Sequence, residues 1–536
     1  MFTLQRYIVR ELIKTFALTA FGLTLVFSLC GGVFNMIQVD VLTALQLWRI
    51  LAHIVPVSVT LTLPVSALFS AAIVFGRLSA DNEFNACRSS GINIHWLLAP
   101  AMSMAVLTAA FTFTFSNFII PNVVEGLEEI VREDPQRAVT QTLRARGHGE
   151  FFGKYVIYAD SFRDAIGDQP DTKLVELNGA AFIELEHSEL ARFGTTPKVL
   201  IQFETPSDGS EPRVIAHMSD VRAYDEKRKQ FYELGDQALG PAIIPQRFTR
   251  KVKWLDLPEL LHYRDQPWAL PRVEQRLQRL REHVQRLFFY HDLVAKLTGP
   301  DGIYRLGTPQ RGYDITAAAA PVDRKSGRPR LDKPVVHQRW DKYRRTFSGE
   351  SGTLAVEQGF TDNQPHVFIT LDKDVVRRDD LAGVETTLRS IELDSVPIPQ
   401  AIVQRAAAIR TSDLLSDKDL GLSPEIDSAR VSLTKGMWGE RRRIDAEIHS
   451  RGAFSASVLV LVVLGAALGI IYRGGQMLIA FVISFVPGLF VTIMIIMGRQ
   501  LAEKDNTALI GLLVIWSGIG LVALADAVVV GRYLRR

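Results

Sequence analysis

The sequence predicts an α-helical polytopic membrane protein in which a large β-rich domain separates two triplets of transmembrane helices. Three observations lead to this fold class. Charged residues nearly vanish from six long stretches near the two ends of the chain and crowd into its middle. Each stretch suits a bilayer core of about 30 Å, which a helix of about 20 apolar residues can cross. The middle instead shows short runs of alternating polar and apolar residues, as strands do.

The membrane spans are predicted from length and lack of charge. Five of the six contain no Asp, Glu, Lys or Arg, and the sixth contains only Asp526. That carboxylate is either a proton or ion site or a group near the helix end that reaches water. The first apolar run is too long for a signal peptide, so we expect a retained anchor. The spans are approximately Phe16–Phe34, Ile50–Phe75, Trp96–Ile120, Ala453–Tyr472, Met477–Met497 and Ala508–Val530.

The orientation follows from the bias of Lys and Arg towards cytoplasmic loops. With the N-terminus in the cytoplasm, nine basic residues fall inside: Arg6, Arg10, Lys14, Arg77, Arg88, Arg473, Arg532, Arg535 and Arg536. The short outer loops then carry three: Arg49, Arg499 and Lys504. This bias predicts both termini inside and three regions: spans one to three in 1–120, an outer domain in 121–450, and spans four to six in 451–536.

The overall composition is less informative because it averages two kinds of sequence. The net charge of +3 is too small to indicate a nucleic-acid partner. The two cysteines, Cys30 and Cys87, lie in or beside apolar segments, so no disulfide framework is expected.

The first part of the outer domain, together with a later segment, reads as strands. Many short strands at this spacing indicate an antiparallel sandwich or open barrel. The expected strands are Lys154–Ala159, Leu174–Leu185, Lys198–Glu204, Arg213–Met218, Gln230–Leu234, Thr353–Gln358, His366–Leu371 and Leu388–Leu393.

Helical spacing interrupts these strands. Apolar residues recur at helical intervals in Pro271–Leu297, with Pro271 at the start and Gly299-Pro300 after the end. The basic stretch Thr308–Arg345 contains Gly and Pro and is predicted to be a flexible surface loop. A further helix over about Ser423–Ser450 is expected to lead into the fourth span.

The loop between spans two and three carries a capped helix at about 79–90. Ser79 suits a helix start, Glu83 its first turn, Arg88 its last turn and Gly91 its C-terminal stop. Such a helix is either a surface connector or a segment that docks into a soluble partner.

Motifs for chemistry are lacking. The sequence has no Gly-x4-Gly-Lys-Ser/Thr loop, so ATP hydrolysis would need a partner. Gly518-x-Gly520-x-x-Ala523 lies within a span and is not a dinucleotide fingerprint. No His-Glu-x-x-His or paired Cys-x-x-Cys indicates a metal site. We therefore expect no catalytic residue, metal or cofactor in this chain.

Three motifs, together with the three-plus-three layout, resemble the LptF/LptG (YjgP/YjgQ) permeases of the lipopolysaccharide export system. The motifs are Tyr7-Ile8-Val9-Arg10-Glu11 before span one, the pattern Gly76, Arg77, Glu83, Arg88 and Gly91 in the loop, and Glu447-Ile448-His449-Ser450-Arg451 at span four. The membrane segments and the loop together cover roughly 200 residues of resemblance.

The resemblance implies a permease subunit of an ABC transporter in the bacterial inner membrane, with a jellyroll-like periplasmic domain. Its implied partners are a second LptF/LptG-type permease, an LptB-like ATPase dimer that binds ATP and Mg²⁺, and LptC/LptA-like jellyroll proteins. The implied substrate is lipopolysaccharide or a related glycolipid, which enters between span one of one subunit and span five of the other. Glu83 would contact the ATPase, and Arg77 and Arg88 would anchor the loop.

The chain departs from the family pattern in two ways. Its outer domain is longer, and the excess is assigned to a helical and basic-loop insertion at about 265–350. Span one carries no Lys or Arg beyond Lys14, whereas relatives place basic residues near its outer end for lipid phosphates. Arg49, Arg499 and Lys504 lie at a depth where they could substitute, or they are interfacial anchors.

Two alternative functions remain. One is a mechanotransmitting ABC-type protein without lipid translocation, which would usually have one span before the outer domain and three after. The other is a membrane-anchored periplasmic binding, sensor or enzymatic module. The sequence does not separate LptF from LptG, or a homodimer from a heterodimer.

Overall fold

The structure is a computed structural model of the 536-residue chain. It describes residues 2–37, 44–123, 148–151, 155–166, 172–186, 189–204, 213–226, 229–234, 237–243, 251–308, 311–322, 328–340, 343–358, 365–379, 383–416, 424–472 and 477–534. The chain divides into two compact units. Unit 1 comprises 1–134, 247–270 and 437–536, and unit 2 comprises 135–246 and 271–436.

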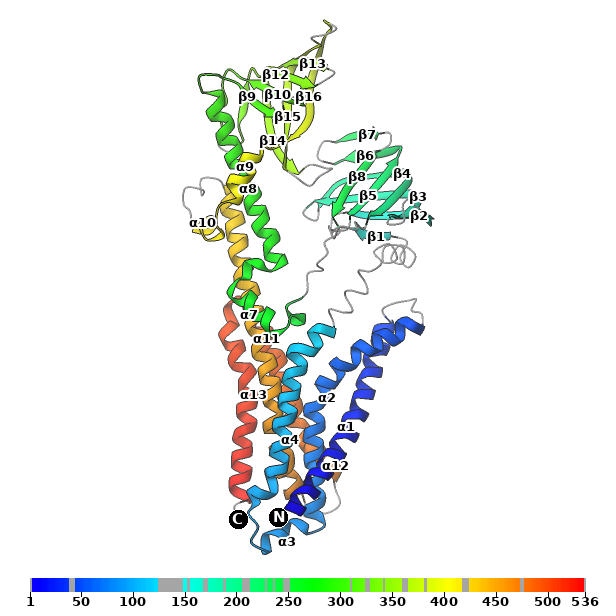
Figure 1. The fold of residues 1–536 in the computed structure, drawn as a ribbon, viewed down its shortest axis with the longest axis vertical. Coiled ribbons are helices and arrows are strands. Elements are labelled where there is room, and N and C mark those ends of the chain that lie inside the picture. The colour runs from blue at the N-terminus through cyan, green and yellow to red at the C-terminus, as the bar shows by residue number, and fades with distance from the viewer. Residues whose placement is uncertain are drawn as a thin grey trace. The chain divides into compact units, whose positions relative to one another are not determined.

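Unit 1 contains the helices that can cross a membrane. Six helices among the described residues are long and apolar enough, which confirms the predicted number. They are α1 (Phe2–Ile37), α2 (Ala44–Ala80), α4 (Ile94–Thr114), α11 (Pro424–Ile471), α12 (Met477–Ala502) and α13 (Ala508–Val529). Both chain ends lie at the same end of this bundle as the short helix α3 (Glu83–Ser89) (Figure 1).

Glycines bring α2 and α11 into close contact. A Cβ atom on Gly465 would lie 2.7 Å from the carbonyl oxygen of Leu68, and one on Gly469 would lie 2.6 Å from that of Ala72. Neither position has room for a side chain, so the two backbones approach as closely as small residues allow. These glycines therefore pack two of the chain's own helices against each other.

Residues 251–270 cluster with the membrane helices of unit 1 and not with the β-rich unit, although they fall inside the predicted outer domain. They form the 3₁₀ turn η2 (Val252–Trp254), α7 (Leu257–Asp265) and the turn η3 (Pro267–Ala269). A capping box starts α7, because Asp256 accepts from the Glu259 amide and the Glu259 carboxylate accepts from the Asp256 amide.

The first sheet of unit 2 contains eight antiparallel strands, with β1-β2-β3-β4-β5-β8 in order and β6 and β7 extending from β4. One face forms a core that includes Val175, Leu177, Val199 and Ile201. The strands predicted in this region are confirmed, and β1, β6 and β8 were not predicted. The strands are β1 (His148–Phe151), β2 (Tyr155–Ile166), β3 (Thr172–Glu186), β4 (Glu189–Glu204), β5 (Arg213–Ser219), β6 (Val221–Asp225), β7 (Gln230–Leu234) and β8 (Gln237–Ile243).

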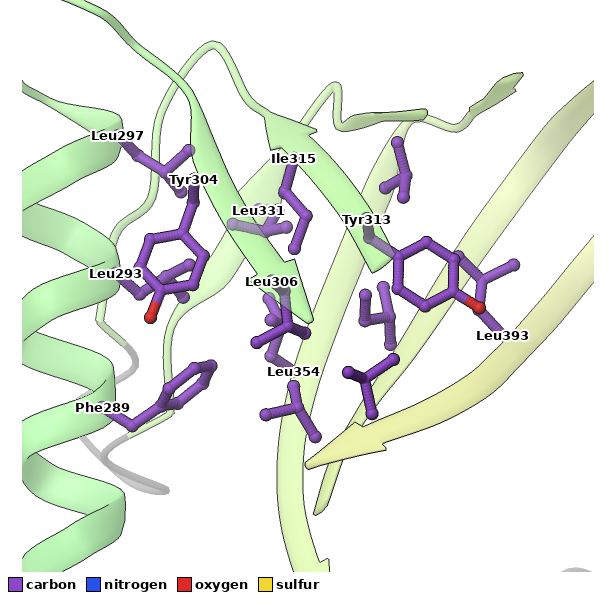
Figure 2. Close-up of a cluster of buried hydrophobic side chains, with 14 of the residues drawn as sticks. Phe289, Leu293, Leu297, Tyr304, Leu306, Tyr313, Ile315, Leu331, Leu354 and Leu393 are labelled. Carbon is purple, nitrogen blue, oxygen red and sulfur yellow. The ribbon is translucent and has the colours of Figure 1, made fainter. Parts of the chain in front are cut away.

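The second sheet of unit 2 also contains eight antiparallel strands, in the order β11-β14-β15-β13-β12-β10-β9, with β16 paired to β15. The predicted helix is confirmed as α8 (Pro271–Leu297), and its Phe289, Leu293 and Leu297 pack against the sheet core (Figure 2). The strands are β9 (Tyr304–Gly307), β10 (Arg311–Thr316), β11 (Arg330–Asp332), β12 (Val335–Trp340), β13 (Tyr343–Ser348), β14 (Ser351–Gln358), β15 (Pro365–Asp379) and β16 (Glu385–Pro397).

The predicted flexible loop at Thr308–Arg345 is wrong for the described residues there. They form β10, β11, β12 and the start of β13. The physical reason is that Tyr313, Ile315, Leu331 and Val336 are fully buried in the core shared with α8. The segment is therefore a structured part of the second sheet.

The chain leaves the second sheet through short helices. α9 (Gln400–Ala407) and α10 (Thr411–Ser416) precede α11, a single helix of 48 residues. This continuity confirms the prediction that a helix over about 423–450 leads into the fourth span.

Candidate functional site

The loop helix α3 is set off from α2 by a tight turn. Asn82 adopts a positive φ of 59°, a left-handed conformation that asparagine tolerates better than most residues. At the other end, Gly91 has φ 78°, and the Ile92 amide donates to the carbonyl of Cys87. This is the Schellman arrangement, so the prediction of Gly91 as the helix stop is confirmed. The helix covers Glu83–Ser89, which is shorter than the predicted 79–90.

The two faces of α3 differ. Phe84 is 1% exposed and belongs to a hydrophobic cluster with residues of α1, α2, α4 and α11, and Cys87 packs against the same cluster. Glu83 is exposed. The inward aromatic side chain therefore fixes the helix to the bundle, and Glu83 lies on its exposed face.

Arg77 ties α2 to α1. Its Nη2 lies 2.9 Å from the Glu11 carboxylate and 3.4 Å from the Tyr7 hydroxyl. The Glu11 side chain is 18% exposed and that of Arg77 is 38% exposed. Both partners come from the N-terminal motif, and nothing in the sequence indicated that this motif contacts Arg77.

Gly76 and Ser79 tie the same end of α2 to α11. A Cβ on Gly76 would lie 3.8 Å from the Cα of Gly469, so the two glycines face one another. The buried Ser79 hydroxyl donates to the carbonyl of Ile470 at 2.8 Å. Ser79 therefore does not cap α3 as predicted. It lies in the last turn of α2 and satisfies a carbonyl at the end of α11.

The structure thus brings Gly76, Arg77 and Glu83 to one end of the bundle, with Gly91 closing α3. The backbone of Arg88 lies in α3, and its side chain is outside what the structure describes. A role for these residues in contact with an ATPase stays a prediction.

A second constellation lies in unit 1 around the Glu447–Arg451 motif. The Arg451 Nε donates to the Glu447 carboxylate at 2.9 Å, an i,i+4 pair on α11. The remaining guanidinium nitrogens donate to the carbonyls of Leu255 and Lys253, both at 3.0 Å. Glu447 is 5% exposed and Arg451 is 7% exposed, so this arginine holds the 3₁₀ turn η2 against α11 from a buried position.

Of the predicted phosphate contacts, Arg499 joins this constellation. Its Nη1 lies 3.1 Å from Glu447 and its Nε 3.5 Å from Glu503. Lys504 is exposed in the turn before η5 (Asp505–Thr507). Arg49 lies in α2, and its side chain is outside the described residues. Two carboxylates therefore already surround the Arg499 cation, and a phosphate role for the three residues stays a prediction.

Further polar contacts join the same end of unit 1. Arg264 of α7 pairs with Asp445 at 2.7 Å, Arg442 pairs with Asp505 at 2.7 Å, and the Trp516 indole donates to His449 at 3.2 Å. Partial desolvation lowers the pKa of Lys253, and the basic neighbours Lys251 and Arg499 lower it further. Sequence reasoning missed this network, and its one local signal was the i,i+4 spacing of Glu447 and Arg451.

Asp526 is 6% exposed in α13, and its Oδ1 has no hydrogen-bond partner among the described residues. Within the same residues, no group of three or more His, Cys, Asp or Glu side chains could hold a metal ion. The choice between an ion site and a water-reaching carboxylate at Asp526 stays open.

Comparison with known protein families gives a match. The family pattern described as lipopolysaccharide export system permease LptF/LptG matches residues 6–290 and 341–530. A search of individually curated proteins finds no match. The matched residues cover nearly the whole chain, including α3, the Glu447–Arg451 motif and all or most of each of the six candidate spans. The chain belongs to the LptF/LptG family of lipopolysaccharide export permeases.

Proposed function

We propose that this chain is the transmembrane permease subunit of an ABC transporter that extracts lipopolysaccharide, or a related glycolipid, from the bacterial inner membrane. Both termini and α3 lie in the cytoplasm, and the β-rich unit lies in the periplasm. The excess of Lys and Arg in the predicted cytoplasmic segments supports this orientation. The position of both chain ends beside α3 is consistent with it (Figure 1).

The observation that carries the proposal is the attachment of α3 and the adjoining end of α2 to several spans. Phe84 anchors α3 in the bundle, Arg77 joins α2 to α1, and Ser79 joins α2 to α11. A partner that binds Glu83 and moves during its own ATP cycle would therefore displace several spans together. This is the property that an ATPase-coupling helix needs.

A second permease and lateral entry of lipid fit the outer surfaces of α1 and α12. Leu18 and Phe21 of α1 are 73% and 71% exposed, and Val486 and Ile496 of α12 are 60% and 53% exposed. These apolar faces suit either acyl chains or the spans of a partner permease. The lipid would leave through the β-rich unit towards LptC/LptA-like jellyroll proteins.

Contacts with lipid phosphates are assigned to Lys504, Arg49 and Arg499. Lys504 is the strongest of the three on structural grounds because it is exposed, whereas Arg499 already faces Glu447 and Glu503. A basic residue at the membrane interface can extend its charged end to the phosphate level.

The test is co-purification of the full chain from native membranes in mild detergent, followed by mass identification of the proteins bound. Glu83→Arg reverses the exposed charge of α3, and Asp81→Arg makes the same charge change in the preceding turn as a matched control. An ABC ATPase that accompanies wild type and Asp81→Arg, and is lost with Glu83→Arg, would support the proposal. Absence of any ATPase from the wild-type sample would contradict it.

A further inference from the structure

One face of the second sheet brings several basic side chains together. Tyr304, Ile315, Val336 and Phe347 point into the core, so their neighbours along each strand point to the opposite face. The strand register places one row across that opposite face, strand by strand: Arg305, Asp314, His337, Thr346, Arg378 and Glu385.

A second pair of arginines lies two residues along the same face. Arg339 of β12 is directly opposite Arg344 of β13. Side chains at such positions have Cβ atoms about 5 Å apart, and like charges there are destabilising. Over β9, β10, β12, β13 and the adjoining ends of β15 and β16, these two rows therefore carry four arginines and two carboxylates, and two of the arginines lie directly opposite each other.

The carboxylates only partly neutralise this face. Arg339 lies 3.1 Å from Asp314, and Arg378 lies 3.9 Å from Glu385 with both side chains more than 60% exposed. Arg305 and Arg344 are exposed and make no ion pair within the part of the chain that the structure describes. The Arg339 Nε is buried, with no hydrogen-bond acceptor among the same residues.

The chemistry of these side chains specifies the ligand. A guanidinium offers paired donors that match the oxygens of a phosphate and keeps its charge at any physiological pH. A phosphate between Arg339 and Arg344 would turn the unfavourable pair into a favourable one, and Arg305 on β9 and Arg378 on β15 could each meet a further anion on opposite sides of it. A rule of local stability broken in this way is expected at a functional site.

The origin of the strands supports a function particular to this chain. β9, β10, β11 and β12 lie in 304–340, which the family pattern does not match. Three basic residues of these two rows, Arg305, His337 and Arg339, come from that stretch. The extra strands thus extend the sheet and supply much of its basic face.

We propose that this face, defined by Arg305, Arg339, Arg344 and Arg378, binds the phosphate groups on the polar head of the transported glycolipid. The inference rests on the proposed function, because that function supplies a phosphorylated glycolipid. It adds a binding site outside the membrane spans and on a sheet separate from the first one.

The test measures binding of a water-soluble disaccharide bisphosphate to the full chain in detergent micelles at low salt. The same disaccharide without phosphates is the reference ligand. Arg305→Glu/Arg344→Glu should weaken binding at least tenfold, and raising the salt should weaken wild-type binding as well. Arg272→Glu/Arg279→Glu on α8 makes the same charge change at two exposed positions, and we expect it to alter binding less than twofold.

Equal binding by wild type and Arg305→Glu/Arg344→Glu, or equal binding of the disaccharide without phosphates, would overturn the inference. So would displacement of the bisphosphate by an acidic peptide of higher affinity, which would point to a protein partner. ATPase co-purification separates this failure from that of the proposed function. If the ATPase accompanies wild type and no bisphosphate binds, the function stands and the site is wrong.

Discussion

Replacing Arg451 by Met tests whether one buried arginine holds residues 252–255 against α11. The methionine has similar length and fills the same space, but it removes the bond to Glu447 and the bonds to the carbonyls of Leu255 and Lys253. The two lost carbonyl bonds both hold the short segment that contains Lys253 and Leu255. The change should therefore appear as local opening of η2 and α7 before it appears as global unfolding.

The magnitude follows from the burial of the pair. Removing one partner of a buried ion pair costs about 3–5 kcal/mol, because the other charge is left uncompensated. Glu447 keeps Arg499 at 3.1 Å, so the lower end of that range applies. A change of about 3 kcal/mol corresponds to about a 100-fold increase in the population of the open segment.

Hydrogen exchange of the full chain in detergent measures that population directly. Amides of residues 252–262 should exchange about 100-fold faster in Arg451→Met than in wild type, a factor derived from the estimated loss. Amides of β15 serve as an internal reference and should not change. Arg451→Lys keeps the charge but lacks the planar fork, so we expect a smaller acceleration of about tenfold.

Two results would refute this reasoning. Unchanged exchange in Arg451→Met would show that the segment is held by α7 contacts such as Arg264–Asp445 alone. Equal exchange in Arg451→Lys and Arg451→Met would show that the positive charge contributes nothing once the forked geometry of the guanidinium is lost.

Three further predictions concern other contacts. Gly469→Ala places a Cβ 2.6 Å from the Ala72 oxygen, so it should lower the stability of the bundle by about 1–3 kcal/mol. Its thermal midpoint in detergent should be lower than that of Gly439→Ala, where nothing lies within 4 Å of the added Cβ. Phe84→Ala empties a fully buried site at a cost of about 3–5 kcal/mol, and α3 should become sensitive to protease and lose the ATPase. Burial lowers the pKa of His283 below its usual 6.5, so the unfolded state binds a proton more readily than the folded state. The free energy of unfolding should therefore fall as the pH drops through and below 6.5. His283→Gln should reduce this pH dependence in thermal unfolding measured between about pH 5 and 7.

The parts of the fold that depend on local sequence could be predicted. A span needs only an uninterrupted apolar run, and all six were found from that feature. Pro271–Leu297 carries its own start, stop and apolar stripe, and its predicted bounds match α8. The strand Gln230–Leu234 likewise matches β7.

The second sheet shows where local reasoning fails. β10, β11 and β12 are runs of three to six residues that each contain an arginine, so their composition resembles a solvated loop. What makes them strands is the burial of Tyr313, Leu331 and Val336 against residues far along the chain, among them Phe289 and Val367. No window of the sequence contains that information.

The contacts made at the candidate sites could not be predicted, for the same reason. Ser79 satisfies the rule for a helix cap, yet its partner is the carbonyl of Ile470, 391 residues away. Arg451 was noticed with its local partner Glu447, but its bond to Lys253 spans 198 residues. Local patterns identified residues in the group around Ser79 and in the group around Glu447–Arg451. Only the fold shows which residues are in contact.

The two constellations of unit 1 are linked by α11 itself. Ser79 bonds to Ile470 at one end of this helix, and Arg451 holds residues 253 and 255 at a position 19 residues earlier, about 28 Å away along the helix axis. Between these points α11 packs on α2 through Gly465 and Gly469, where the two backbones are in direct contact with no side chain between them. A close-packed contact of this kind transmits displacement instead of absorbing it. A force applied at α3 therefore reaches the segment 251–265 through one continuous helix, without passing through a loop.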